Sequence, residues 1–210
     1  DARVTFIYER LAEIDLILNQ NNSSLLIKHG KPIQVWKDLI NEFQIKNIFF
    51  NTDYEPKTRK RDQEISLLLE KNNISTHSFK DHVCFQADEI LKSDGKHYTV
   101  FTPYYKQWRK KLDENPVEKY PSETLLSNLN PSKFKFSITL KDLGFDTHIK
   151  EIPSMGFSDK LSQYDQWRDF PAKDATSHIG IHLRFGTISI REAITSAIAN
   201  GAEKWLSELA

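Results

Sequence analysis

The sequence predicts an α/β fold with a doubly wound parallel sheet, followed by a mainly helical C-terminal part. Three observations lead to this prediction. Stretches with helical periodicity alternate with short apolar runs over residues 3–79. One of these runs, NIFFN at 47–51, is apolar through its centre, which is typical of a parallel strand covered on both faces. From residue 157 onward the periodicity is helical.

Helices and strands are expected to alternate in the N-terminal part. The first helix has apolar residues at helical spacing on one face, namely Val4, Ile7, Leu11, Ile14 and Leu18. The strands are short apolar runs bounded by polar turns. We therefore expect helices at 3–18, 32–44 and 56–72, and strands at 24–29, 47–51 and 74–79.

A long connection and then further helices are expected after residue 85. Residues 86–156 carry five of the eight prolines and no clean period, but their dense aromatic residues indicate a folded connection. Helices are expected at 157–168, 177–184 and 189–209. We place a domain boundary near 130–156.

Composition excludes several classes of protein. Acidic and basic residues balance at 29 each, so the net charge alone indicates no nucleic-acid partner. The single cysteine, Cys84, excludes an internal disulfide and fits a reducing cytoplasm, and its apolar neighbours predict that it is buried. The sequence contains no apolar stretch of about 18 residues and no signal-peptide pattern. We therefore expect a cytoplasmic protein without a membrane segment.

The stretch DYEPKTRKRD at 53–62 follows a predicted strand, where α/β folds bind ligands. Its cations are Lys57, Arg59, Lys60 and Arg61. The favoured interpretation is a solvated helix start with mixed ion pairs, and an anion or cofactor site is the alternative.

The stretch at 97–112 interleaves aromatic residues with cations. Such a pattern could stack nucleobases and neutralise phosphates. The favoured interpretation is an amphipathic helix, because Tyr105, Trp108 and Leu112 fall on one helical face.

Other familiar sites lack support in the sequence. His178 and His182 lie four residues apart, but no carboxylate accompanies them at ligand spacing, so no metal site is predicted. The sequence has neither a glycine-rich phosphate loop nor a nucleophile elbow. No catalytic residue is assigned.

The stretch ATSHIGIHLRFG at 175–186 predicts a capped helix start. Thr176 or Ser177 is expected to be the N-cap of the helix. The free backbone N–H groups of the first turn could bind a phosphate, but plain capping is the more common use of such a pattern.

Three of these stretches together resemble the DNA photolyase/cryptochrome family. DYEPKTRKRD is similar to that family's N-Y-x-Y-E-P-…-R-D segment, and VFTPYYKQW is similar to its V-F-T-P-F-x-x-x-W motif. YDQWRDFPAKDATSHIGIHLRFGTISIRE resembles the stretch that opens the family's flavin-binding domain. The three occur in the family's order and are spread over most of the chain.

The resemblance implies a set of site residues. Tyr164 would contact FAD, and Arg168 would lie at a surface that faces damaged DNA, where a guanidinium suits a phosphate. The turn that holds the FAD pyrophosphate would consist of Thr176, Ser177, His178, Ile179 and Gly180. Two residues depart from the family pattern: His178 replaces a frequent Arg, and Gly180 replaces the usual Ser.

The resemblance also implies that the chain is an internal fragment of a longer protein. An incomplete doubly wound (Rossmann-like) sheet is then expected, lacking its first strands. The implied division is an antenna-type α/β domain at 1–130, a connection at 131–156 and the start of a helical FAD-binding domain at 157–210. The open sheet edges predict self-association of the fragment.

The implied activity of the parent protein is that of a deoxyribodipyrimidine photolyase, a carbon–carbon lyase. It would split cyclobutane pyrimidine dimers by light-driven electron transfer from reduced FAD. The fragment alone is expected to be inactive and to lack FAD. Lys57 and Thr58 do not match a folate antenna, so a deazaflavin, a flavin or no antenna is left open. The alternatives are a cryptochrome-type blue-light photoreceptor and a generic nucleotide-binding α/β module.

Overall fold

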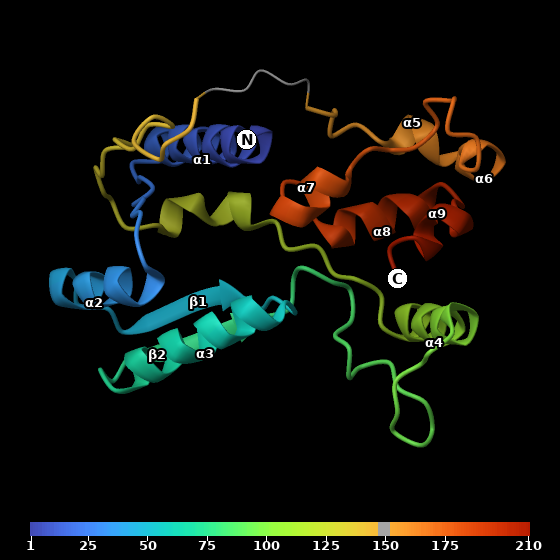
Figure 1. The fold of residues 1–210 in the computed structure, drawn as a ribbon, viewed down its shortest axis with the longest axis horizontal. Coiled ribbons are helices and arrows are strands. Elements are labelled where there is room, and N and C mark those ends of the chain that lie inside the picture. Colours follow the sequence, from blue (N-terminus) through green and yellow to red (C-terminus); the bar gives the residue numbers. More distant parts are fainter. Residues whose placement is uncertain (147–151) are drawn as a thin grey trace. The chain divides into compact units, whose positions relative to one another are not determined.

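The computed structural model describes residues 1–146 and 152–210 (Figure 1). Its contacts divide the chain into two compact units, each made of two segments. The first unit comprises Asp1–Leu39 and Tyr120–Pro153, and the second comprises Ile40–Lys119 and Ser154–Ala210. The boundary falls inside helix α2 (Pro32–Glu42), which begins at Pro32 as predicted.

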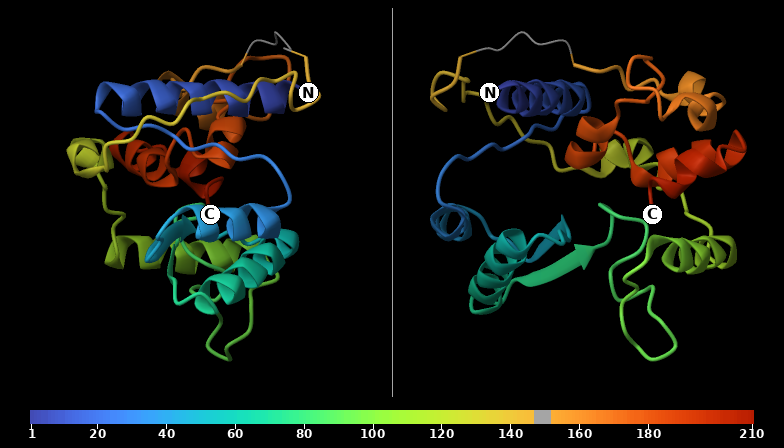
Figure 2. Two further views of the ribbon diagram at one scale, coloured as in Figure 1. Left: turned by 90° about the vertical axis from the view of Figure 1, so that its left-hand side faces the viewer. Right: turned by 45° about the vertical axis from the view of Figure 1, so that its right-hand side comes forward.

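The first unit contains α1 (Ala2–Gln20) and the short 3-10 helix η1 (Ser122–Asn128), which Figure 2 also shows. The Asp1 carboxylate caps α1 by accepting a hydrogen bond from the N–H of Arg3. The apolar face predicted for α1 is only partly right. Its buried residues are Thr5 and Phe6, whereas Ile7 and Ile14 are 37% and 45% exposed.

The strand predicted at 24–29 is wrong, because no strand occurs there. Side chains rather than a neighbouring strand satisfy the backbone of this segment. The N–H of Ser24 donates to Ser132 Oγ at 3.0 Å, and the N–H of Leu25 donates to Asp15 Oδ1 at 2.8 Å. An apolar run of strand length therefore becomes an extended loop when no partner strand lies beside it.

The second unit contains a parallel pair of strands, β1 (Asn47–Asn51) and β2 (Ser75–Phe79). Helix α3 (Pro56–Glu70) connects them and packs on β2. Asn47 pairs with Ser75 and Asn51 with Phe79, so the carboxyl ends of both strands meet at one edge. This arrangement confirms the α/β class.

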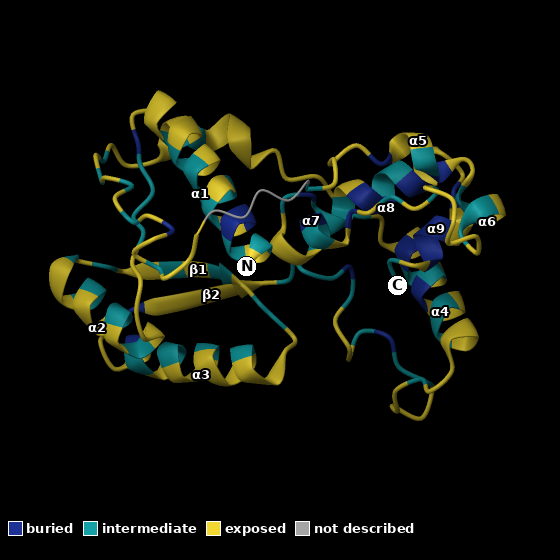
Figure 3. Ribbon diagram, turned by 45° about the horizontal axis from the view of Figure 1, so that its top comes forward, coloured by how far each residue is buried: buried dark blue, intermediate teal, exposed yellow. Residues whose placement is uncertain are grey.

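The sheet is much more open than the sequence indicates. Phe49 and Phe79 are 67% and 54% exposed, and all of β2 is coloured as exposed in Figure 3. Phe49 stacks on His77 with ring centroids 4.7 Å apart. The buried, two-sided strand predicted at 47–51 is thus correct in its position but not in its burial.

An extended loop leads from β2 to helix α4 (Phe101–Glu114) (Figure 2). The favoured interpretation of this stretch as an amphipathic helix is confirmed: Trp108 and Leu112 are buried, whereas Lys106 and Lys110 are exposed. Arg109 is held by Glu203 at 3.2 Å.

The C-terminal helices are shorter and more numerous than predicted. They are α5 (Ser158–Leu161), α6 (Tyr164–Trp167), α7 (Gly180–Phe185), α8 (Ile190–Ala199) and α9 (Glu203–Ser207). The helix predicted at 189–209 breaks at Gly201, whose φ of 62° is favourable for glycine. The helix predicted at 157–168 is likewise divided in two.

A core cluster lies between α4 and the C-terminal helices. It includes Trp108, Leu112, Phe157, Ile179, Ala193, Ile194, Trp205 and Leu206. Cys84 belongs to the same cluster, as its apolar neighbours predict. The ring of Phe157 stacks on that of Trp205 with centroids 5.3 Å apart. This core holds the helices that carry the candidate site residues. The predicted domain bounds at 130 and 156 stay a prediction.

Candidate functional site

Tyr164 and Arg168 lie beside each other on α6 and its C-terminal end. The Arg168 guanidinium carbon is 5.6 Å from the centre of the Tyr164 ring. Its Nη1 binds the Glu208 carboxylate and its Nε lies 3.3 Å from Asp169 Oδ1. Burial raises the pKa of the Tyr164 hydroxyl, and the Glu208 carboxylate adds to that effect. Arg168 is therefore held in place by two carboxylates and an aromatic ring.

Side-chain hydrogen bonds hold the predicted pyrophosphate turn, residues 176–180, in place. Thr176 Oγ1 lies 3.3 Å from His178 Nε2, and that nitrogen lies 2.9 Å from Asp174 Oδ1. The φ of His178 is 54°, in the left-handed region. Hydrogen bonds from Lys160 and His178 lower the pKa of Asp174. These contacts fix the conformation of the turn.

The predicted N-cap of α7 is wrong. The helix starts at Gly180, and Ile179 is the N-cap, with no side-chain hydrogen bond to the first turn. The hydroxyls of Thr176 and Ser177 are engaged elsewhere. Ser177 Oγ accepts a hydrogen bond from Trp205 Nε1 at 3.3 Å. Local spacing alone could not show that an indole 28 residues away uses this hydroxyl.

The turn presents hydrogen-bond donors that suit a phosphate. Within the described residues, the backbone N–H groups of 176–180 have no hydrogen-bond partner, and a serine hydroxyl that accepts from an indole can still donate its own proton. A Cβ at Gly180 would meet no atom within 4 Å, so the turn is open there. These donors fit the pyrophosphate of a dinucleotide.

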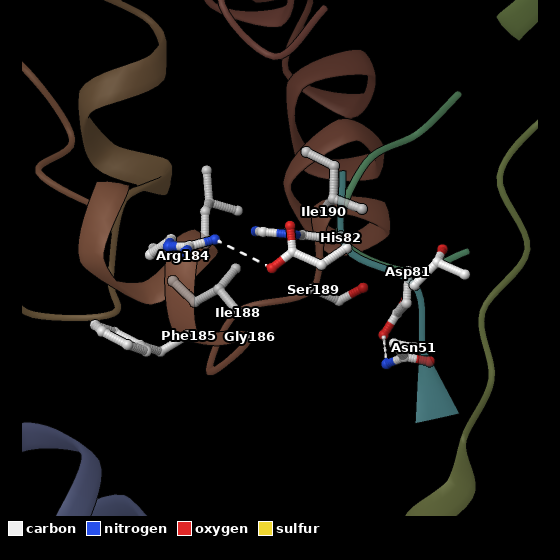
Figure 4. Close-up of a pocket in the computed structure, with 12 residues that line it drawn as sticks. Asn51, Asp81, His82, Arg184, Phe185, Gly186, Ile188, Ser189 and Ile190 are labelled. Atoms are coloured by element: carbon white, nitrogen blue, oxygen red, sulfur yellow. Dashed lines mark hydrogen bonds and ion pairs between the residues drawn. The ribbon is translucent and has the colours of Figure 1, made fainter. Parts of the chain in front are cut away.

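A second candidate site is a cavity of about 340 Å³ at the carboxyl ends of both strands (Figure 4). Its lining from the strand ends is Asn51, Thr52, Asp53, Asp81 and His82. Its lining from α7, α8 and their connection is Leu183, Arg184, Phe185, Gly186, Ile188, Ser189 and Ile190. The alternative interpretation of 53–62, a ligand site after the first strand, is thus matched by a cavity that Asp53 lines.

Ionic groups surround this cavity. Arg184 Nη2 lies 3.0 Å from Glu55 Oε1, and its Nη1 lies 3.8 Å from Asp53 Oδ2. A hydrogen bond from the N–H of Glu55 lowers the pKa of Asp53, and the positive charges of His82 and Arg184 act in the same direction. Of the four cations of 53–62, Arg61 pairs locally with Asp62 at 2.6 Å and none lines the cavity.

Several residues of these sites were not predicted from the sequence. Trp205 of α9 contacts Ser177, and Glu208, the C-cap of α9, binds Arg168; no local pattern relates these distant positions. Asp81 could have been found, because it follows β2 as Asp53 follows β1. His178 and His182 bind different partners: His182 Nδ1 lies 2.8 Å from Thr187 Oγ1.

Among the helices of the described ranges, none is long and apolar enough to cross a lipid bilayer.

Comparisons with known proteins give one consistent result. The family model for DNA photolyase matches residues 1–122. A deoxyribodipyrimidine photo-lyase from Synechococcus is 30% identical over the whole of this chain, which spans 49% of that protein. The chain thus spans about half the length of the curated relatives that it matches.

Two solved structures share the fold. A bacterial class III photolyase from Agrobacterium tumefaciens gives a TM-score of 0.75 at 22% identity, over 99% of this chain and 46% of that one. An archaeal photolyase from Sulfolobus tokodaii, solved with two FAD molecules, gives 0.65 at 22% identity over the same shares.

Proposed function

The chain belongs to the DNA photolyase family, and we propose that the protein containing it is a light-driven DNA repair enzyme. The proposed reaction is the splitting of cyclobutane pyrimidine dimers, and FAD supplies the electron that starts it. The observation that carries the proposal is the 176–180 turn, where backbone N–H groups without partners and two hydroxyls lie together at a helix start.

The residues of this turn would bind FAD through two kinds of hydrogen-bond donor, hydroxyl groups and backbone N–H groups. Thr176 and Ser177 would donate hydroxyl hydrogen bonds to the pyrophosphate, and the N–H groups of His178, Ile179 and Gly180 would donate from the backbone. Ile179 is buried and anchors the turn in the core. Tyr164 would contact the flavin from α6, with its ring orientation fixed by Arg168.

The second site would take a light-harvesting chromophore. Support comes from the cavity at the strand ends, which has the position expected of a ligand site in an α/β fold. The solved structure from Sulfolobus tokodaii holds two FAD molecules, with the implication of a novel light-harvesting cofactor. A flavin or a deazaflavin is therefore the class of chromophore to test.

Damaged DNA is the proposed partner, and Arg168 is the proposed phosphate contact. A guanidinium held by Glu208 and Asp169 keeps one geometry, which reduces the side-chain entropy lost when a phosphate binds. We place the protein in the cytoplasm, where the free thiol of Cys84 would stay reduced.

The chain of 210 residues by itself is proposed to be inactive and to bind FAD weakly or not at all. Self-association through the open sheet is also proposed, because Phe49 and Phe79 are more than half exposed beside an unpaired strand edge. Sedimentation of the chain and of a Phe49→Ser/Phe79→Ser double variant tests this. A concentration-independent monomer in the unaltered chain would contradict self-association.

Repair in living cells tests the main proposal. The full-length protein should restore the survival of ultraviolet-sensitive, photolyase-deficient cells in blue light but not in darkness. A Thr176→Ala/Ser177→Ala double variant should lose flavin absorbance and survival together. Bound flavin without any repair would contradict the proposal and favour the photoreceptor alternative.

A further inference from the structure

Two arginines of the C-terminal helices reach the loops that follow the two strands. Arg184, in the last turn of α7, binds Glu55 at 3.0 Å and lies 3.8 Å from Asp53. Arg191, in the first turn of α8, binds the Asp81 carboxylate, and its Nη2 donates to the carbonyl of Lys80 at 2.9 Å. Each guanidinium thus crosses from a helix to a different strand end.

The carboxylates that receive these arginines are themselves fixed by the strand ends. Asp53 accepts a hydrogen bond from the N–H of Glu55 at 3.0 Å. Asp81 accepts one from Asn51 Nδ2, at the end of β1, at 3.2 Å. The side chains of Asp53 and Arg191 are 20% and 22% exposed, whereas those of Arg184, Glu55 and Asp81 are 45%, 49% and 40% exposed, so these pairs are partly screened by solvent.

Helix α7 depends on contacts of this kind. It has six residues, and its N-cap supplies no side-chain hydrogen bond. A helix this short is not stable alone and takes its position from tertiary packing. Ile179 and His182 are buried and hold one side of it, whereas Arg184 holds its last turn at the strand ends.

We propose that Arg184 and Arg191 are positioning residues that fasten α7 and the start of α8 to the carboxyl ends of β1 and β2. Helix α7 follows the 176–180 turn directly, and its last residues line the strand-end cavity. The position of this short helix therefore determines the position of both the 176–180 turn and the α7 side of the cavity. The two arginines determine where the helix lies. The role given to the 176–180 turn rests on the proposed function, but the attachment itself does not.

Hydrogen–deuterium exchange of the 210-residue chain tests the attachment without any cofactor. Arg184→Gln should speed exchange of the hydrogen-bonded amides of 183–185 about fivefold, the effect of losing one partly exposed ion pair, and leave α4 unchanged. Arg184→Lys keeps a positive charge beside Asp53 and Glu55 and should exchange more slowly than Arg184→Gln. Arg61→Gln is the matched control, since it removes a pair that stays within α3.

Unchanged exchange at 183–185 in Arg184→Gln would overturn the proposal, as would an equal rise in α4, which would mean general loosening. The effect on the turn is read from the FAD dissociation constant of the full-length protein. Arg184→Gln should weaken FAD binding about fivefold, and Arg184→Lys should weaken it less. FAD binding that is as tight in Arg184→Gln as in the unaltered protein would contradict the link to the turn. Absence of FAD binding in the unaltered protein would count against the proposed function, while the exchange result would still decide the attachment.

Discussion

The indole N–H of Trp205 donates a hydrogen bond to Ser177 Oγ, with 3.3 Å between the two heavy atoms. Trp205 is 3% exposed and stacks on Phe157, so its position is set by the core. The bond uses a lone pair of the serine oxygen and leaves the hydroxyl proton directed elsewhere. A core residue therefore orients one hydroxyl of the proposed pyrophosphate turn.

Removal of that hydroxyl should destabilise the chain. Ser177→Ala leaves the buried indole N–H without its partner, and we expect the free energy of unfolding to fall by about 1–2 kcal/mol. Urea unfolding followed by tryptophan fluorescence measures it. Thr176→Ala is the control, because the Thr176 hydroxyl contacts the exposed side chain of His178 and should matter less. An equal fall in the free energy of unfolding in both variants would show that the Trp205–Ser177 hydrogen bond contributes no more than the Thr176–His178 contact.

Asp53 should make stability depend on pH in acid. A hydrogen bond from the N–H of Glu55, with the charges of His82 and Arg184, lowers the pKa of Asp53 below its ordinary value of 3.8. The folded state therefore favours the carboxylate. This contribution is fully present above pH 3.8 and is lost as the pH falls through the lower folded-state pKa.

Urea unfolding at a series of pH values from 6 to about 3 checks this sign. The free energy of unfolding should fall less steeply in Asp53→Asn than in the unaltered chain. Asp142→Asn is a useful comparison, because the pKa of Asp142 is also lowered but by a local hydrogen bond from Thr139. Identical slopes in Asp53→Asn and the unaltered chain would contradict the role given to Asp53.

The extent to which sequence predicted this structure depends on the range of the contacts involved. The bounds of 47–51 were correct and α3 was nearly so, because Pro56 and the local periodicity determine where these elements lie. The strand at 24–29 was wrong because a strand needs a neighbour, and Asp15 and Ser132 bind its backbone instead. Local pattern carries no information on such partners.

The candidate site shows the same difference between residues that a local motif indicates and residues that depend on distant contacts. A motif, which is a local property, indicates the 176–180 turn and Tyr164, and their roles stay predictions. Glu208 and Trp205 were not, since they lie 40 and 28 residues from the side chains they bind. The cap of α7 was misplaced for the same reason: the two hydroxyls that suit capping have other partners.

Cys84 should react slowly with thiol reagents. Burial raises the pKa of its thiol from 9.0 to about 11, so the reactive thiolate is roughly a hundredfold scarcer than for an ordinary cysteine near pH 8. Reaction with a colorimetric disulfide reagent, with and without urea, measures the difference. Rapid reaction of the folded chain would show that the loop around Cys84 opens readily.

Arg168 should contribute to DNA affinity in a salt-dependent way if it contacts a phosphate. In the full-length protein, Arg168→Gln should weaken binding to ultraviolet-irradiated DNA at low salt. The slope of log affinity against log salt should become shallower by about one, because one fewer counterion is released. Lys106→Gln removes the same charge from an exposed position on α4 and should leave that slope unchanged.

The carboxylates around Arg168 make the experiment more specific. Glu208 and Asp169 both bind the guanidinium, so a phosphate would share or displace them. Asp169→Asn removes the more exposed of the two charges and should strengthen DNA binding slightly, while Glu208 still holds the guanidinium over Tyr164. A loss of affinity in Arg168→Gln without any change in the salt slope would mean that Arg168 acts on the fold of α6 and not on a phosphate.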